Sequence, residues 1–162
     1  MAQNKDRASE MIYVDQFGYP NRVIPKINTY ANNNNLYVGL DGYDDEYSCW
    51  DPYCDVTVNV GKLPFLESAI DTNNNGDKII AFLEGNGFGR LTGKILPSGY
   101  CWFPVFRFNP EKLKEIDAAG FAEYEKAHGR DAKTLAEQIE AAEKGKGDQP
   151  SASRASRVPP IK

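Results

Sequence analysis

The stretch Leu36–Gly61, LYVGLDGYDDEYSCWDPYCDVTVNVG, contains the clearest structural pattern in this chain of 162 residues. Apolar residues alternate with polar or small residues at both of its ends, which predicts two half-buried strands. The segment between them, Gly42–Asp55, connects the strands, and its Asp51-Pro52 step favours a turn or an irregular stretch. The residues expected to face the core are Leu36, Val38 and Leu40 in the first strand and Val56, Val58 and Val60 in the second, with Asp55, Thr57 and Asn59 facing water.

Further strands are predicted on both sides of this stretch. MIYVDQF (11–17) and RVIPKINTY (22–30) have strand-like composition, and Asn32–Asn35 supply a turn because asparagine tolerates left-handed backbone angles. GRLTGKIL (89–96) and GYCWFPVFRF (99–108) predict an antiparallel pair joined through Pro97, Ser98 and Gly99. The strands therefore form hairpins of an antiparallel sheet.

Helices are predicted in the middle and in the second half of the chain. Residues 77–84 show a short helical pattern that ends at the glycines of GNGFG (85–89). Asn109 is a predicted N-cap with Pro110 in the first helical position, and Asp117 is expected to cap the helix that follows, with Phe121 and Tyr124 facing inward. The expected fold class is α+β, with one short packed helix in the middle, C-terminal helices and a disordered C-terminal tail.

The domain organisation follows from composition. A single α+β domain is expected over 11–129, after a flexible leader (1–10), and is followed by a peripheral helix (130–144) and a disordered basic tail (145–162). The leader lacks an apolar stretch and no apolar run approaches about 18 residues, so we expect a cytoplasmic protein that does not contact membranes. An odd set of three cysteines, Cys49, Cys54 and Cys101, predicts reduced thiols that act mostly as buried small hydrophobes.

Negative charge is concentrated in one region. The chain has a net charge of −4, yet no lysine or arginine occurs between Lys26 and Lys62. A region of this kind repels nucleic-acid phosphates and attracts basic partners. The six carboxylates in this window are Asp41, Asp44, Asp45, Glu46, Asp51 and Asp55.

Two metal motifs are incomplete. DTNNNG (71–76) matches the beginning of a calcium loop, but Phe82 stands where the bidentate glutamate is needed, so a polar turn that caps the helix at Asp77 is expected instead. A zinc site would need Cys101 and His128 in addition to Cys49 and Cys54, whose spacing is marginal. His128 is expected to be exposed on a surface helix, and we predict no metal and no cofactor.

Catalytic patterns are equally weak. A cysteine or serine nucleophile needs a nearby base, and the sole histidine is His128. Asp51 beside Trp50 is the one candidate for acid–base chemistry. GNGFG lacks the Lys-Ser or Lys-Thr pair of a phosphate loop. We therefore expect a protein without enzymatic activity.

The aromatic segment 99–108 has two interpretations. Tyr100, Trp102, Phe106 and Phe108 share one face, and Cys101, Phe103, Val105 and Arg107 share the other. With both faces apolar, a buried core strand is the simpler interpretation. The alternative is a single-strand nucleic-acid-binding protein that uses Tyr100, Trp102 and Arg107 together with the basic tail.

Surface recognition by an acidic aromatic face is the leading functional hypothesis. Tyrosine and tryptophan give large contact area at low entropic cost, and surrounding carboxylates select a basic protein partner. The competing interpretation is that about half of these rings pack into the core and the acids keep a loop soluble. The predicted partner-binding residues are Tyr43, Asp44, Asp45, Glu46, Tyr47, Trp50, Asp51, Tyr53 and Asp55.

Three segments together resemble a known type of domain. They are LYVGLDGYDDEYSCWDPYCDVTVNV (36–60), the DTNNNG turn (71–76) and GYCWFPVFRFN (99–109). Over about 11–129 they are similar to a small uncharacterised domain carried on conjugative elements and plasmids of Gram-positive gut bacteria. The resemblance implies a mobile-element setting and transfers no catalytic residue. In that setting, the expected role is an accessory protein that inhibits or tunes a host defence or transfer protein.

Overall fold

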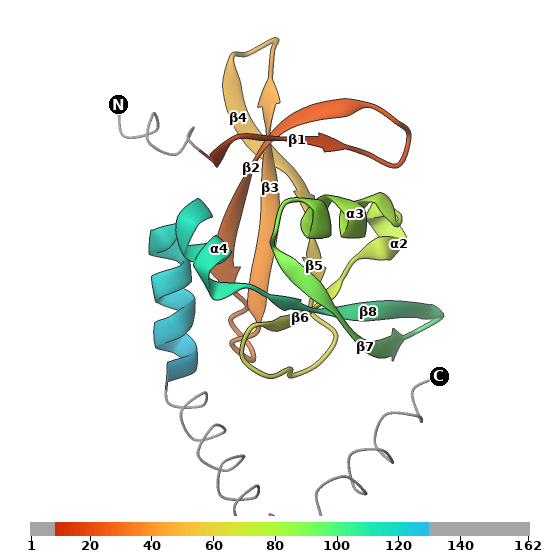
Figure 1. The fold of residues 1–162 in the computed structure, drawn as a ribbon, viewed down its shortest axis with the longest axis vertical. Coiled ribbons are helices and arrows are strands. Elements are labelled where there is room, and N and C mark those ends of the chain that lie inside the picture. Colours follow the sequence, from red (N-terminus) through yellow and green to blue (C-terminus); the bar gives the residue numbers. More distant parts are fainter. Residues whose placement is uncertain (1–8, 130–162) are drawn as a thin grey trace, which may run out of the picture.

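The strands form two four-stranded antiparallel sheets in a computed structural model that describes residues 9–129 (Figure 1). The first sheet has the order β1 (Met11–Val14), β2 (Pro20–Thr29), β3 (Leu36–Asp44) and β4 (Cys49–Asp55). The second has the order β5 (Thr57–Val58), β6 (Glu67–Ile70), β8 (Cys101–Phe108) and β7 (Gly89–Ser98). The α+β prediction is confirmed, and the predicted hairpins divide between two sheets.

Helices lie beside both sheets. α2 (Thr72–Asn75) and α3 (Lys78–Gly85) separate β6 from β7, and α4 (Pro110–Ile116) is followed by a helical segment at 118–129. The predicted middle helix is α3. The carboxylate of Asp71 accepts from the backbone N–H of Asn74, so DTNNNG caps its own short helix α2. The expectation that this turn caps the Asp77 helix was therefore wrong, since no side chain caps α3.

Val56 is the residue at which the chain leaves the first sheet and enters the second. Its N–H donates to the carbonyl of Val38, and its own carbonyl accepts from the N–H of Asp71. The prediction of one amphipathic strand from Asp55 through Val60 was therefore wrong. The chain changes direction at Val56, so the alternation of buried and exposed side chains does not continue beyond it. Thr57 is buried rather than facing water, its hydroxyl accepting from the N–H of Val38 and bonding to the hydroxyl of Tyr30.

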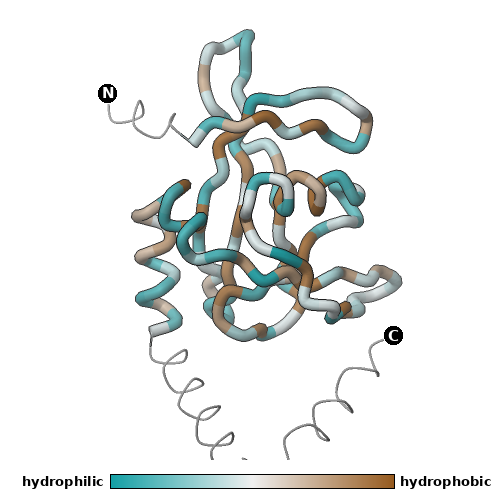
Figure 2. The backbone as a smooth tube through the Cα atoms, in the orientation of Figure 1, coloured by the Kyte–Doolittle hydropathy of each residue, from teal (hydrophilic) through white to brown (hydrophobic). Residues whose placement is uncertain are grey.

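The core lies between the two sheets and under the helices, and the chain segments there consist mainly of apolar residues (Figure 2). Leu36, Val38 and Leu40 are buried there, as the alternation in β3 predicts. The interpretation of 99–108 as a core strand is confirmed for its second half, because Val105 packs on one face of β8 and Phe106 on the other.

The C-terminal helical region joins the first sheet through Asp117. Strand β1 pairs only with Pro20–Val23, so the remaining edge of β2 needs another partner. One carboxylate oxygen of Asp117 accepts from the N–H of Ile27 and the other from the N–H of Gly120, both at 2.9 Å. Asp117 therefore caps the helical segment, as predicted, and also binds the edge of the sheet.

His128 is buried and not exposed, which corrects the prediction for this residue. Its ring lies 4.9 Å from the ring of Tyr124 and 5.5 Å from that of Phe65. The loop that carries Phe65 covers this side of the helix, a contact that helix periodicity does not reveal.

Several expectations concern segments outside the described residues. These are the peripheral helix at 130–144, the basic tail at 145–162 and most of the leader. Ser9 and Glu10, at the end of the leader, are described and bind Ile116 and Arg22. From residue 9 to residue 129, no helix combines the length and the apolar character needed to cross a membrane.

Candidate functional site

The first sheet forks at its upper end. Strands β2 and β3 pair from Thr29–Leu36 as far as Val23–Gly42. Above this point β2 pairs only with β1, and β3 only with β4. The two hairpins consequently diverge, one pointing up and the other to the side in Figure 1.

An open groove of about 760 Å³ lies between the two hairpins. Four carboxylates line it and only one cation, Arg22, so we name it the acidic groove. Hydrophilic residues cover the tip of the upper hairpin (Figure 2). The lining residues are Pro20, Asn21, Arg22, Gly42, Tyr43, Asp44, Asp45, Glu46, Asp51, Pro52 and Tyr53.

A β-bulge shapes the wall formed by β4. Asp41 pairs with Pro52 but Leu40 pairs with Cys54, which leaves Tyr53 as the extra residue. The prediction of a turn or irregular stretch at Asp51-Pro52 was wrong, because both residues pair with β3 in the edge strand β4, where proline is tolerated, and the bulge lies at the next residue. Cys54 packs against the core, and the ring of Tyr53 meets the ring of the buried Tyr13 at 6.3 Å.

Arg22 connects the two hairpins across the fork. Its guanidinium carbon lies 4.2 Å from the centre of the Tyr43 ring and 5.5 Å from that of Trp50, and it forms an ion pair with Glu10. Tyr43 and Trp50 also meet edge to face at 5.2 Å. These cation–π contacts hold the upper hairpin against β2 and set the opening of the groove.

The six carboxylates of the acidic window have different environments. Asp41 forms an ion pair with Lys26 at 2.8 Å, and Asp55 accepts from the hydroxyl of Tyr37 at 2.6 Å. Asp44 accepts from the backbone N–H groups of Glu46 and Tyr47, so it closes the tip turn. Asp45, Glu46 and Asp51 are exposed and form no ion pair within residues 9–129, and Asp51 accepts only from the thiol of Cys49, at 3.8 Å.

The structure brings six of the nine predicted partner-binding residues into the acidic groove, namely Tyr43, Asp44, Asp45, Glu46, Asp51 and Tyr53. Tyr47 stands at the tip with 72% of its surface exposed. Trp50 packs against Tyr43 and Arg22, and Asp55 lies at the far end of β4. Sequence reasoning missed Arg22, because only the pairing of β2 with β3 reveals that it reaches the acidic window.

The three residues of the nucleic-acid alternative do not form one surface. Tyr100 is fully exposed in the β7–β8 turn and Trp102 is 62% exposed next to it. Arg107 lies five residues beyond Trp102 on β8, which corresponds to about 17 Å along an extended strand. There it binds Glu67.

Within residues 9–129 there is no group of three or more histidine, cysteine, aspartate or glutamate side chains placed to hold a metal ion. Cys49, Cys54 and Cys101 are free thiols and half-buried, less buried than predicted. Only Cys54 packs against the core.

Cys54 should make stability fall at alkaline pH. Burial, followed by the charges of Asp55 and Asp71, raises the pKa of its thiol from 9.0 to about 12. As the pH rises above 9.0, the thiol of Cys54 loses its proton in the unfolded chain while it keeps it in the folded protein. Ionisation therefore favours the unfolded chain, and the free energy of unfolding falls progressively between pH 9.0 and the raised pKa of the folded state. Urea unfolding should give a lower free energy of unfolding at about pH 10.5 than at about pH 8. This difference between the two pH values should be smaller for Cys54→Ala than for the wild-type protein. An identical loss in both proteins would contradict this assignment.

A comparison with protein-family models matches residues 25–128 to a family described as "Domain of unknown function (DUF4313)". The matched range runs from β2 into the helical segment at 118–129 and contains most of the acidic groove. No curated protein and no solved structure matches the chain.

Proposed function

Since this chain belongs to the DUF4313 family, whose description names no activity, we propose from its geometry that it is a non-enzymatic protein-binding module. The acidic groove would receive lysine or arginine side chains of a basic partner. The observation that carries this proposal is the convergence of Asp45 and Glu46, from the tip turn of one hairpin, and Asp51, from its strand β4, on a single open groove.

The size and electrostatics of the groove support this proposal. A volume of about 760 Å³ accommodates one or two long side chains. Asp45, Glu46 and Asp51 have no hydrogen-bonded cation among the described residues, whereas Asp41 is neutralised by Lys26. Carboxylates of this kind speed the encounter with a positively charged partner and disfavour an acidic one.

Aromatic rings supply the contact area beside these charges. Tyr47 is 72% exposed at the tip and Tyr53 is 41% exposed in the wall of the groove. A tyrosine ring can cover the aliphatic part of an incoming lysine or arginine and bind its charge through a cation–π contact. Rings and carboxylates therefore favour the same kind of ligand.

The mobile-element setting is also part of the proposal. It rests on the resemblance of 36–60, 71–76 and 99–109 to domains of conjugative elements and plasmids. A basic host defence or transfer protein in the cytoplasm would be the partner in that setting. Gene neighbourhoods of family members, examined for conjugation and plasmid-maintenance genes, test this part independently of binding.

The expected result is that a charge-neutral groove loses its protein partner. The full chain is used as bait in host lysate beside a D45N/E46Q/D51N variant. Asp44 is left intact because its bonds to the tip turn would confound the comparison. Partners that bind through these carboxylates should decrease at least about tenfold with the variant, since losing charge-assisted bonds weakens binding by that order.

A D77N/E84Q/E123Q variant is the matched control. It removes the same three charges from exposed positions on other parts of the domain. The control should retain the partners of the wild-type chain. Equal capture of every protein by the wild-type chain and both variants would refute the proposed groove function.

Single-strand nucleic-acid binding is the second candidate. The exposure of Tyr100 and Trp102 favours it, because two rings at a hairpin tip can stack on unpaired bases. The distance of Arg107 from these rings, and its ion pair with Glu67, weaken the case. Retention of nucleic acid instead of protein by both variants in the capture experiment would favour this candidate.

A further inference from the structure

A second pocket shares no lining residue with the acidic groove, and its charge is positive. It has a volume of about 670 Å³ and opens between the loop that precedes β6 and the base of the β7–β8 hairpin. Two arginines, Arg90 and Arg107, stand beside apolar residues in its wall. The lining residues are Phe65, Leu66, Gly87, Gly89, Arg90, Arg107, Phe108, Asn109 and Pro110.

The two arginines are held directly opposite each other. Arg90 on β7 pairs in register with Arg107 on β8. Directly opposed residues of antiparallel strands have Cβ atoms about 5 Å apart, and like charges at such positions repel each other. An anion bound between the two guanidinium groups would relieve this repulsion.

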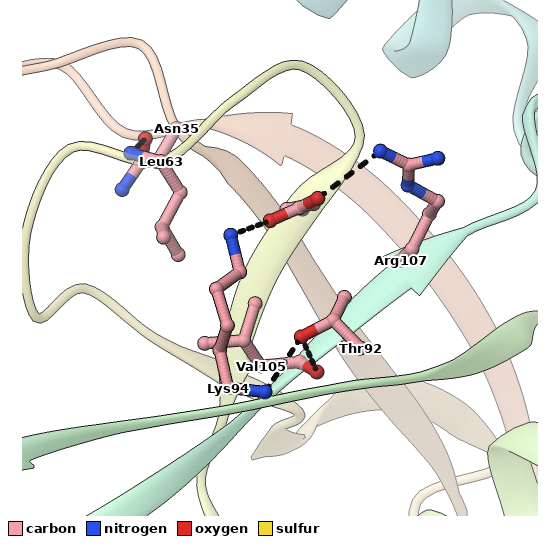
Figure 3. Close-up of polar contacts among 7 residues, drawn as sticks. Asn35, Leu63, Thr92, Lys94, Val105 and Arg107 are labelled. Atoms are coloured by element: carbon pink, nitrogen blue, oxygen red, sulfur yellow. Dashed lines mark hydrogen bonds and ion pairs between the residues drawn. The ribbon is translucent and has the colours of Figure 1, made fainter. Parts of the chain in front are cut away.

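Among residues 9–129, one carboxylate forms ion pairs with this cluster. Glu67 is almost fully buried and shares its carboxylate between Lys94, at 2.7 Å, and Arg107, at 3.3 Å (Figure 3). Two cations thus share one carboxylate, and Arg90 stands opposite one of them, Arg107. Arg90 is exposed and has no ion-pair partner among residues 9–129.

Arg107 keeps most of its binding capacity. Only one of its terminal nitrogens reaches Glu67, and its side chain is 62% exposed. A guanidinium carries five N–H donors in a planar fork that fits carboxylate and phosphate oxygens. Glu67 therefore orients Arg107 without occupying it.

The rest of the pocket suits an apolar group next to the anion. Phe65 stacks on Tyr124 at 5.3 Å, which fixes its ring as one wall, and Pro110 forms another. Gly87 has no atom near the position that a Cβ would take, so the space above it is open. Leu66 adopts a φ of 74°, an uncommon backbone angle for a leucine and one that is frequently found at binding sites.

We propose that this pocket binds an oxyanion, a phosphate monoester or a carboxylate, that is attached to an aromatic or apolar group. Arg90 and Arg107 contact the anion, and Phe65 and Pro110 contact its apolar part. The site is separate from the acidic groove and does not depend on the function proposed for it.

Phenyl phosphate and benzoate are the probes for this site. Titration calorimetry on the full chain should show saturable binding of at least one of them, weaker binding of inorganic phosphate, and none of benzyl alcohol, which has no charge. The two anions distinguish a phosphate ligand from a carboxylate ligand. Absence of saturable binding of both below about 10 mM would overturn the proposal.

R90Q and K78Q are the paired variants. R90Q removes an exposed side chain without a partner in the described fold and should weaken binding about tenfold or more. K78Q removes the same charge from an exposed position on α3, outside the pocket, and should change the dissociation constant less than about twofold. Equal affinity of R90Q and the wild-type chain would overturn the assignment, whereas D45N/E46Q/D51N should bind the probes unchanged.

Discussion

Gly89→Ala is expected to destabilise the domain by about 3 kcal/mol, enough to shift the urea midpoint clearly. Gly89 has a φ of 144°, which side-chain-bearing residues rarely adopt. A Cβ at this position would lie 3.0 Å from the carbonyl carbon of Arg107 and still closer to its oxygen. Because Gly89 pairs with Phe108, the first residue pair of β7 and β8 would have to separate.

Two other glycines separate the effect of this clash from that of backbone strain. Gly93 has a φ of 93° but open space around it, so Gly93→Ala should cost only about 1 kcal/mol. Gly85, in α3, has neither constraint, and Gly85→Ala should stabilise the helix by about 0.5 kcal/mol. A Gly89→Ala effect no larger than that of Gly93→Ala would show that the contact with Arg107 is unimportant.

Asp117→Ala should lower the free energy of unfolding by about 3 kcal/mol, because it removes two kinds of hydrogen bond. One carboxylate oxygen caps the helical segment through Gly120, and the other satisfies the N–H of Ile27 on the edge of β2. Losing both leaves a part-buried backbone donor without its acceptor. Urea unfolding followed by circular dichroism measures the change.

Asn109→Ala is the matched control for this prediction. Asn109 caps α4 through the N–H of Glu111 but has no side-chain bond to the sheet. Its loss should cost about 1 kcal/mol. If Asp117→Ala cost no more than Asn109→Ala, the bond between Asp117 and Ile27 would contribute nothing to stability.

The local elements could be predicted because their causes lie within a few residues. Alternation predicts β3, and Leu36, Val38 and Leu40 are indeed buried. The cap at Asn109 follows from its side chain and from Pro110 beside it. The turn at Asn34 follows from its tolerance of a positive φ, here 63°.

Most of the acidic groove was also predictable, but its environment was not. The absence of basic residues between Lys26 and Lys62 indicates an acidic surface in the sequence alone. Arg22 lies outside that window, yet the pairing of Val23 with Gly42 places its guanidinium against Tyr43. Counting charges along the sequence therefore misses Arg22, which reaches the acidic groove from a neighbouring strand.

The pocket lined by Arg90 and Arg107 could not have been predicted, because a register shift brings these two residues opposite each other. Without the shift between Leu91 and Ile95, the pairing of Ser98 with Cys101 would place Arg107 opposite Thr92. The two additional residues of β7 bring Arg90 there instead.

The sequence by itself determined strand β3, the β7–β8 hairpin, the middle helix, the caps at Asn109 and Asp117 and the sign of the charge around 41–55, since all of these depend on near neighbours. Tertiary structure alone decided the crossing at Val56, the burial of Thr57 and His128, and the approach of Arg90 to Arg107. These features depend on which distant segments pair and in which register. That choice is made by the packing of the whole core, and no local propensity contains it.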